Sequence, residues 1–162
     1  MKYIAFFLSL TLLVACSDDD DAGNAGGSSD DQFSATIDGQ SYEISGRFAF
    51  AEPIDDDLFA VYGSEDQSTP GFTNVFLSFE GRPTVGTYDL SLGSGTLGTW
   101  INTGSGETFI SGFTGGSGTA EVTEITDDRI KGTFSFVGVD VGGSLPNKVV
   151  ENGTFDVRIG FE

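Results

Sequence analysis

Apolar and polar residues alternate with a period of two from Phe33 onward, and this pattern limits the secondary structure that the chain can form. Phe33, Ala35 and Ile37 share one face of an extended segment, while the polar residues between them fall on the other face. The same alternation returns in later segments, at residues 42–50, 75–79, 130–136 and 155–161. It is typical of half-buried β-strands. No segment after residue 16 has the apolar spacing of an amphipathic helix, so we expect almost no helix.

Turn residues divide this part of the chain into about nine or ten short strands. We expect strands near residues 33–38, 41–51, 58–64, 73–80, 86–92, 97–102, 107–113, 118–126, 129–139 and 148–161. Short strands separated by turns every 8–12 residues predict an antiparallel β-sandwich or barrel. The sequence therefore predicts a single all-β domain over residues 33–162, which is long enough to bury one core. Its glycine-rich part, residues 86–118, should be the least regular.

The hairpin at residues 127–128 allows two registers. A two-residue loop places Glu121 opposite Phe134, whereas a three-residue loop over residues 127–129 places Val122 opposite Phe134. The second register brings apolar residues together, and a slip of one residue would exchange the two faces of the strand. We therefore expect the three-residue loop.

The first 15 residues have the pattern of an export signal. Lys2 precedes an apolar run over residues 4–13. This length is typical of a secretory signal and too short for a membrane-spanning helix. The tetrapeptide Leu13-Val14-Ala15-Cys16 resembles the bacterial lipobox, in which a diacylglycerol is attached to the cysteine thiol and the signal is cleaved before it. The alternative is a buried helix that ends at a free cysteine. The apolar run, its position at the start of the chain and the tetrapeptide all indicate the first interpretation. We therefore expect residues 1–15 to be a lipoprotein signal peptide and Cys16 to be the lipid attachment residue.

Residues 16–32 would then join the lipid to the first strand. This segment contains six aspartates and no aromatic residue. It has too little apolar surface to offset the entropy of ordering, which predicts a disordered acidic tether. The run Asp18–Asp21 also resembles the surface-export signal of Bacteroidota lipoproteins. The resemblance implies a lipid anchor in the outer membrane with the domain exposed at the cell surface; the alternative is a solvated spacer without a sorting role.

Composition excludes several classes of function. The chain has 7 basic and 25 acidic residues, a formal net charge of −18, which argues against a nucleic-acid partner. The absence of histidine removes the commonest general base and neutral metal ligand, and one cysteine allows no disulfide within the chain. The segment 93–98 has the glycine spacing of a dinucleotide-binding loop, but strand-like residues follow where that loop needs a helix. We expect no cofactor.

Carboxylates are the remaining candidates for chemistry. One cluster contains Glu52 and three consecutive aspartates, which are Asp55, Asp56 and Asp57. Further acids occur at Glu65, Asp66 and Glu107. Paired carboxylates catalyse glycoside hydrolysis, and the three aspartates with backbone carbonyls form a weak candidate for a calcium site. A solvated surface is the interpretation that we favour for all of these acids.

Trp100 is the residue that we single out for possible ligand contact. Tryptophan stacks well on flat ligands and is frequent at interface hot spots. A tryptophan buried in the core is the commoner alternative.

Several segments together resemble a family of small, uncharacterised Bacteroidota lipoprotein β-domains. The segments that carry this resemblance are Phe33–Gly39, Gly86–Tyr88, Ile130–Phe136 and Glu151–Val157. The last two contain a Gly-Thr-Phe repeat, as neighbouring core strands would produce. The resemblance implies an all-β, lipid-anchored protein, and it transfers no activity and no catalytic residue.

Two functions of different classes remain. The first is a non-enzymatic, lipid-anchored binding or interaction module at the outer-membrane surface, with a glycan or an envelope protein as partner. The second is a carboxylate-dependent glycan hydrolase, with residues 55–57 or Glu107 near its site. We expect the first, because no activated nucleophile or base is recognisable. A purely structural or adhesive role is a third possibility.

Overall fold

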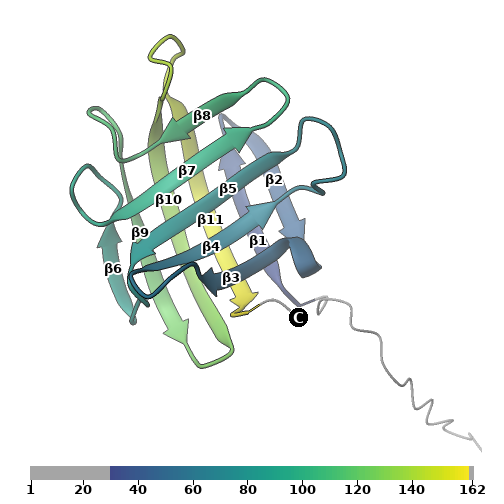
Figure 1. The fold of residues 1–162 in the computed structure, drawn as a ribbon, viewed down its shortest axis with the longest axis vertical. Helices are drawn as coiled ribbons and strands as arrows, with labels where there is room; N and C mark the ends of the chain where they lie inside the picture. Colours follow the sequence, from purple (N-terminus) through teal and green to yellow (C-terminus); the bar gives the residue numbers. More distant parts are fainter. Residues whose placement is uncertain (1–29, 161–162) are drawn as a thin grey trace, which may run out of the picture.

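The computed structural model describes residues 30–160 as a β-domain (Figure 1). The expected signal peptide, Cys16, the aspartate run and Phe161 lie outside the described residues. Its elements are β1 (Gln32–Ile37), β2 (Gln40–Ser45), a 3-10 turn η1 (Gly46–Phe48), β3 (Ala49–Pro53), β4 (Leu58–Ser64), β5 (Thr73–Glu80), β6 (Gly86–Asp89), β7 (Thr96–Asn102), β8 (Glu107–Ile110), β9 (Ser117–Ile125), β10 (Arg129–Asp140) and β11 (Lys148–Arg158). These strands all pair antiparallel, which confirms the predicted all-β antiparallel class.

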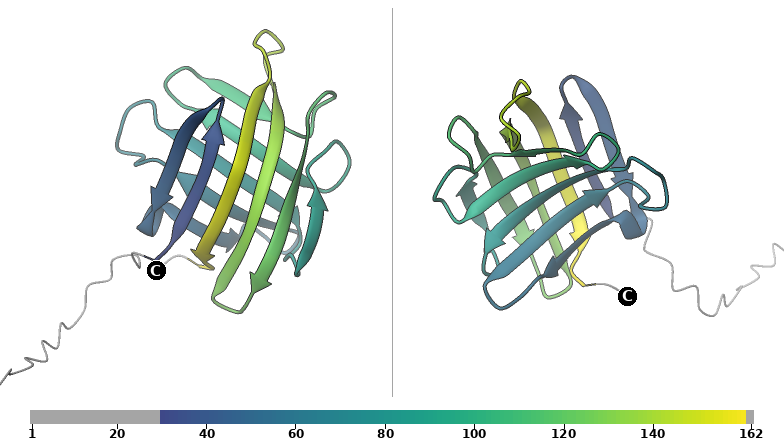
Figure 2. Two further views of the ribbon diagram at one scale, coloured as in Figure 1. Left: turned by 180° about the vertical axis from the view of Figure 1, so that it is seen from behind. Right: turned by 45° about the horizontal axis from the view of Figure 1, so that its top comes forward.

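Two sheets face each other and are joined along one side. A six-stranded sheet has the order β6-β9-β10-β11-β1-β2, and a five-stranded sheet has the order β3-β4-β5-β7-β8. The end of β10 leaves β9 and pairs with β8 through Val139 and Asp140. This pairing joins the sheets into one nearly closed, barrel-like sheet. Figure 1 shows the five-stranded sheet in front, running obliquely across the other, and Figure 2 shows the six-stranded sheet from behind.

The strand expected over residues 41–51 is divided by η1, and this division reverses its faces. Gly46 has a positive φ of 65°, a conformation that favours glycine, and the chain passes there from β2 in one sheet to β3 in the other. As a result Ala49 and Ala51 are buried, whereas Phe50 lies on the outer face. The alternation over residues 42–50 places Phe50 on the same face as Tyr42, and this prediction is wrong.

The β9–β10 hairpin has a two-residue turn, so the predicted three-residue loop is also wrong. The hydroxyl of Thr126 donates to the Asp128 carboxylate at 2.7 Å and stabilises the tight turn. A bulge at Thr123 then shifts the register by one residue, so that Ala120 pairs with Phe134. The bulge returns the apolar residues of β9 to the inward face. The predicted face is therefore correct, although the pairing is not.

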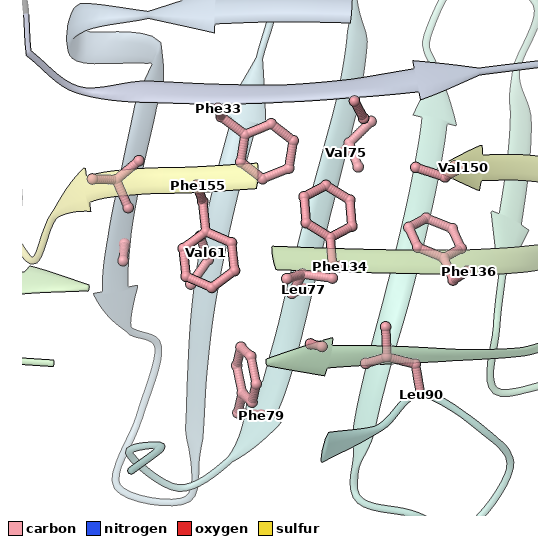
Figure 3. Close-up of a cluster of buried hydrophobic side chains, with 14 of the residues drawn as sticks. Phe33, Val61, Val75, Leu77, Phe79, Leu90, Phe134, Phe136, Val150 and Phe155 are labelled. Carbon is pink, nitrogen blue, oxygen red and sulfur yellow. The ribbon is translucent and has the colours of Figure 1, made fainter. Parts of the chain in front are cut away.

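Phenylalanine rings and aliphatic side chains fill the space between the sheets. Figure 3 shows the rings of Phe33, Phe134, Phe136 and Phe155 directed toward Leu77 and its neighbours. All five side chains are almost completely buried. Both sheets contribute rings and aliphatic side chains to this core, since the five-stranded sheet adds the buried rings of Phe59, Phe79 and Phe109.

The two Gly-Thr-Phe segments are neighbours in β10 and β11, as the repeat suggested. Their antiparallel register pairs Gly132 with Phe155 and Gly153 with Phe134. A Cβ atom at either glycine would collide with the facing ring. The repeat is therefore a reciprocal packing motif, in which each glycine makes room for the phenylalanine of the other strand.

The barrel-like sheet stays open between β2 and β3, and Tyr42 bridges this seam. Its hydroxyl donates to the Gly63 carbonyl at 2.6 Å and lies 3.2 Å from the Thr73 carbonyl. Burial, with a smaller contribution from the Glu65 charge, raises the pKa of Tyr42 above its ordinary value. The neutral hydroxyl therefore links β2 to the five-stranded sheet across the seam.

The folded domain begins two residues before the expected boundary at residue 33. Asp31 is only 1% exposed, and its carboxylate lies 2.8 Å from Arg158 Nε and 3.3 Å from Arg129 Nη1. Arg129 also pairs with Asp156. Two arginines from β10 and β11 therefore hold the start of the described chain against the end of the domain where β11 finishes.

Candidate functional site

Trp100, the residue singled out for ligand contact, lies in the core near one end of the barrel-like sheet. It is 7% exposed and meets Phe109 edge to face, with ring centroids 5.5 Å apart. The Lys148 ammonium lies 4.5 Å from the centre of the indole ring and forms an ion pair with Asp38 at 3.0 Å. Trp100 therefore presents no open ring face for a ligand, and the alternative of a core tryptophan describes it better.

The three consecutive aspartates lie in the exposed β3–β4 hairpin. The Asp55 carboxylate accepts a hydrogen bond from the backbone N–H of Asp57 at 2.9 Å, which closes the turn locally. Within residues 30–160 no three carboxylate or thiol side chains converge in a way that could hold a metal ion. Asp55, Asp56 and Asp57 are thus turn residues with a solvated surface in this structure.

The other acids of the hydrolase hypothesis lie in two different parts of the five-stranded sheet. Glu65 and Asp66 lie in the β4–β5 loop, where they accept hydrogen bonds from the backbone N–H groups of Thr73 and Ser68. Glu107 opens β8 and pairs with the end of β7. The structure thus assigns loop-stabilising contacts to Glu65 and Asp66, whereas Glu107 lies on a different strand.

Every carboxyl group with a shifted pKa in the described part of the chain is shifted downward. The backbone N–H of Ser68 lowers the pKa of Asp66, and that of Ser144 lowers the pKa of Asp140. The other two lowered carboxyl groups are Asp38 and Asp128. A general acid of glycoside hydrolysis needs the opposite shift, toward higher pKa.

The two sheets have outer faces of opposite character. Across the six-stranded sheet, one row of paired residues reads Ser34, Thr154, Thr133, Glu121 and Thr87. These side chains line or adjoin a shallow polar groove of about 630 Å³. Such a surface is normal for a sheet that has one face in water.

The outer face of the five-stranded sheet carries an aromatic row instead. One row of paired residues reads Phe50, Tyr62, Phe76, Thr99 and Ile110. The rings of Phe50 and Tyr62 are stacked with centroids 4.8 Å apart, and Tyr62 and Phe76 are 5.6 Å apart. All three rings are partly exposed. We call this surface, Phe50, Tyr62 and Phe76, the aromatic face.

A surface pocket of about 330 Å³ lies at the β3 end of the aromatic face. Its lining residues are Arg47, Phe48, Phe50, Ser64, Asp66 and Gln67. They come from η1, β3, the end of β4 and the β4–β5 loop. The pocket therefore forms beside the seam, where the barrel-like sheet does not close. We call it the seam pocket.

The sequence interpretation missed these residues, although one signal for the aromatic face was present. Both β4 and β5 are apolar on two faces: Tyr62 follows the buried Val61, and Phe76 lies between the buried Val75 and Leu77. An apolar run of this kind indicates a strand covered on both sides or one with an apolar outer surface. No comparable signal marks Arg47, because its position depends on the turn at η1.

The structure thus defines an antiparallel, barrel-like β-domain with one polar and one aromatic outer face. No match is found for the chain among models of known protein families, curated proteins or solved structures. Within residues 30–160 no helix has the length and apolarity needed to cross a membrane.

Proposed function

We propose that this chain is a lipid-anchored binding module of the cell envelope, attached through Cys16, that binds a glycan or envelope protein without catalysis. The observation that supports it is the contrast between the two outer faces of the domain. Both sheets bury one face in the same core, but only the five-stranded sheet places aromatic side chains on its other face. A contiguous apolar patch in contact with water is typical of interaction sites, whereas scattered apolar residues are not.

In this proposal, the tether expected from the sequence joins the described domain to the membrane. Fourteen residues, Ser17 to Asp30, separate the lipobox cysteine from the ion pairs at Asp31. Fully extended, they would reach roughly 46–50 Å at about 3.3–3.6 Å per residue. A domain on such a link can turn its aromatic face toward ligands beside or above the membrane. The acidic run after Cys16 supports placement at the cell surface of the outer membrane.

The chemistry of the acids favours binding over hydrolysis. Each shifted carboxyl group is held as an anion by hydrogen bonds, and Asp66, in the seam pocket, is one of them. A hydrolase would need a second carboxylate across the pocket and a raised pKa on one partner. The seam pocket has one carboxylate among its lining residues.

Membrane fractionation tests the anchor. We expect Cys16→Ser to move the protein from the membrane fraction to a soluble or unprocessed form, because the thiol that receives the lipid is lost. A cleaved Cys16→Ser protein that stays in the membrane fraction would contradict the anchor.

Binding to isolated cell envelopes tests the aromatic face. We expect the Tyr62→Ser and Phe76→Ser double variant to bind about tenfold more weakly than the parent protein, because it loses two rings. The matched control is Thr133→Ala with Thr154→Ala on the outer face of the other sheet, which should bind like the parent. No envelope binding by the parent, or equal loss in both variants, would contradict the proposed function.

A further inference from the structure

We infer that the seam pocket binds one uncharged sugar residue at the end of a glycan, with Arg47, Asp66 and Gln67 as its polar contacts. This inference rests on the proposed function and names the ligand class of the aromatic face. It follows from the state of the Arg47 guanidinium, from the charges that line the pocket and from the pocket size.

Arg47 differs from every other basic side chain that the structure describes. The other five donate to a carboxylate or a carbonyl oxygen; they are Arg82, Arg129, Lys131, Lys148 and Arg158. The Arg47 side chain makes neither a hydrogen bond nor an ion pair within residues 30–160. Its guanidinium lies over the Phe48 ring, 4.7 Å from the ring centre. In a chain with 25 acidic residues, this leaves five N–H donors without an acceptor among the described residues, held in place by an aromatic ring.

Asp66 lines the same pocket and yet does not pair with Arg47. The Arg47 charge contributes to the lowered pKa of Asp66, after the hydrogen bonds from Ser68, so the two groups influence each other. They are nevertheless too far apart to form an ion pair. One carboxylate oxygen accepts from Ser68 N–H at 2.9 Å, and Gln67 makes no hydrogen bond to the described chain. Donors and acceptors with unused capacity therefore meet in one pocket.

This set of groups matches a sugar residue better than an ion. A hydroxyl group both donates and accepts, so neighbouring sugar hydroxyls can bind a guanidinium, a carboxylate and an amide together. The Phe48 and Phe50 rings supply apolar walls for the C–H groups of the sugar ring. Asp66 and the net charge of −18 oppose an acidic residue such as a uronate, and Arg47 opposes a cation.

The dimensions of the pocket indicate a single residue at a chain end. A volume of about 330 Å³ is at the low end of the range for ligand pockets, roughly 300–1,000 Å³. Beyond Phe50, the row continues through Tyr62 to Phe76 along the outer face of the sheet. The next residues of a glycan would therefore lie over the aromatic face.

Isothermal titration of the full-length mature protein in detergent tests this inference. The probes are neutral hexaoses of glucose and of xylose, in α- and β-linked forms, with hexagalacturonate as the acidic comparison. We expect at least one neutral hexaose to bind, and hexagalacturonate to bind about tenfold more weakly or not at all. Arg47→Ala and Gln67→Ala should each weaken binding of the neutral ligand by about tenfold. Arg47→Lys should restore only part of it, because an ammonium lacks the planar fork of donors.

Arg82→Ala is the matched control. Arg82 is exposed and lies outside the seam pocket, and its substitution removes the same charge as Arg47→Ala. It should bind like the parent, and circular dichroism should show that all variants fold. The inference is overturned if no neutral hexaose binds, if hexagalacturonate binds more tightly, or if Arg47→Ala binds like the parent. Envelope binding that needs Tyr62 and Phe76 but not Arg47 would overturn the sugar pocket and leave the proposed function standing.

Discussion

Glycine and phenylalanine form complementary pairs across the core of this domain. Phe134 of β10 lies over Gly153 of β11, and Phe155 lies over Gly132 in return. A third ring, Phe33, occupies the space beside Gly63 of the facing sheet. Each pair joins one of the largest side chains to a residue without a side chain, so the two backbones stay close. Some of the 24 glycines of the chain are therefore core residues.

Gly153→Ala tests this packing. Gly153 does not have a positive φ, so the added methyl group acts through the Phe134 ring and not through backbone strain. We expect the free energy of unfolding to fall by about 1–3 kcal/mol, as for other overpacked cores. Equilibrium unfolding in urea measures it. Thr133→Ala, exposed on the neighbouring strand, is the control and should change stability by less than about 0.5 kcal/mol. A Gly153→Ala protein as stable as the parent would show that the ring can move aside.

At the scale of elements, the decisive feature is the passage of the chain from one sheet to the other at η1. Gly46 ends the pairing of β2, and its N–H donates to the Asp31 carbonyl at 2.9 Å. The chain then enters β3 at the far edge of the five-stranded sheet. This passage leaves the seam that Tyr42 bridges and places Arg47 beside the β4–β5 loop. The same turn therefore creates both the opening in the sheet and the pocket beside it.

Tyr42→Phe tests the link across the seam. The substitution removes the buried hydrogen bond from the hydroxyl to the Gly63 carbonyl, and we expect a loss of about 0.5–1.5 kcal/mol in unfolding free energy near neutral pH. Tyr62→Phe, which removes a hydroxyl that makes no hydrogen bond within the described chain, should change stability by less than about 0.5 kcal/mol. Urea unfolding measures both. Equal effects of the two substitutions would contradict a structural role for the Tyr42 hydroxyl.

The raised pKa of Tyr42 predicts how the stability of the domain changes at alkaline pH. The pKa of Tyr42 is raised in the folded state by burial, so folding favours the neutral phenol. Its contribution is complete below the unfolded pKa of about 10 and is lost as the pH rises from there toward the folded pKa. Between about pH 8 and pH 11, the parent should therefore lose more unfolding free energy than Tyr42→Phe does. A larger alkaline loss in the variant would contradict this assignment.

At the scale of the whole molecule, the domain has two unlike faces and one end from which the chain departs. The polar face belongs to the six-stranded sheet and the aromatic face to the five-stranded sheet. Figure 2 shows these two sheets on opposite sides of the domain. The ion pairs of Asp31 hold the first described residues beside the end of β11. A lipid at Cys16 would therefore attach the domain to the membrane through this end. The outer faces of both sheets would then stay uncovered.

Replacement of Asp18–Asp21 by asparagine tests whether the acidic run directs the protein to the cell surface. Acylation should be unchanged, because the lipobox lies before the run. The fraction cleaved when intact cells meet an external protease should decrease. The matched control replaces Asp55, Asp56, Asp57 and Asp127 by asparagine, which changes the net charge by the same amount on exposed turns of the domain. Equal protease accessibility of both variants and the parent would show that the acidic run is a spacer without a sorting role.

The sequence alone determined the fold class and most of the inward faces. A period of two is a local property of an extended chain, so alternation correctly placed Val75, Leu77 and Phe79 in the core, and likewise Phe134 and Phe155. The repeated Gly-Thr-Phe segments even indicated which strands are neighbours. These features need no knowledge of distant residues, because each strand carries its own pattern.

Only the tertiary structure decided what lies on the outer surfaces and which loops meet. Alternation continues unchanged when a chain leaves one sheet for another, so it could not show that Phe50 points outward or that a bulge at Thr123 shifts a register. The aromatic face exists because β3, β4 and β5 pair in a register that brings Phe50, Tyr62 and Phe76 into one row. Arg47 and Asp66 are 19 residues apart and share a pocket because pairing between β3 and β4 brings their loops together. Such proximity depends on long-range strand pairing, which no local pattern encodes.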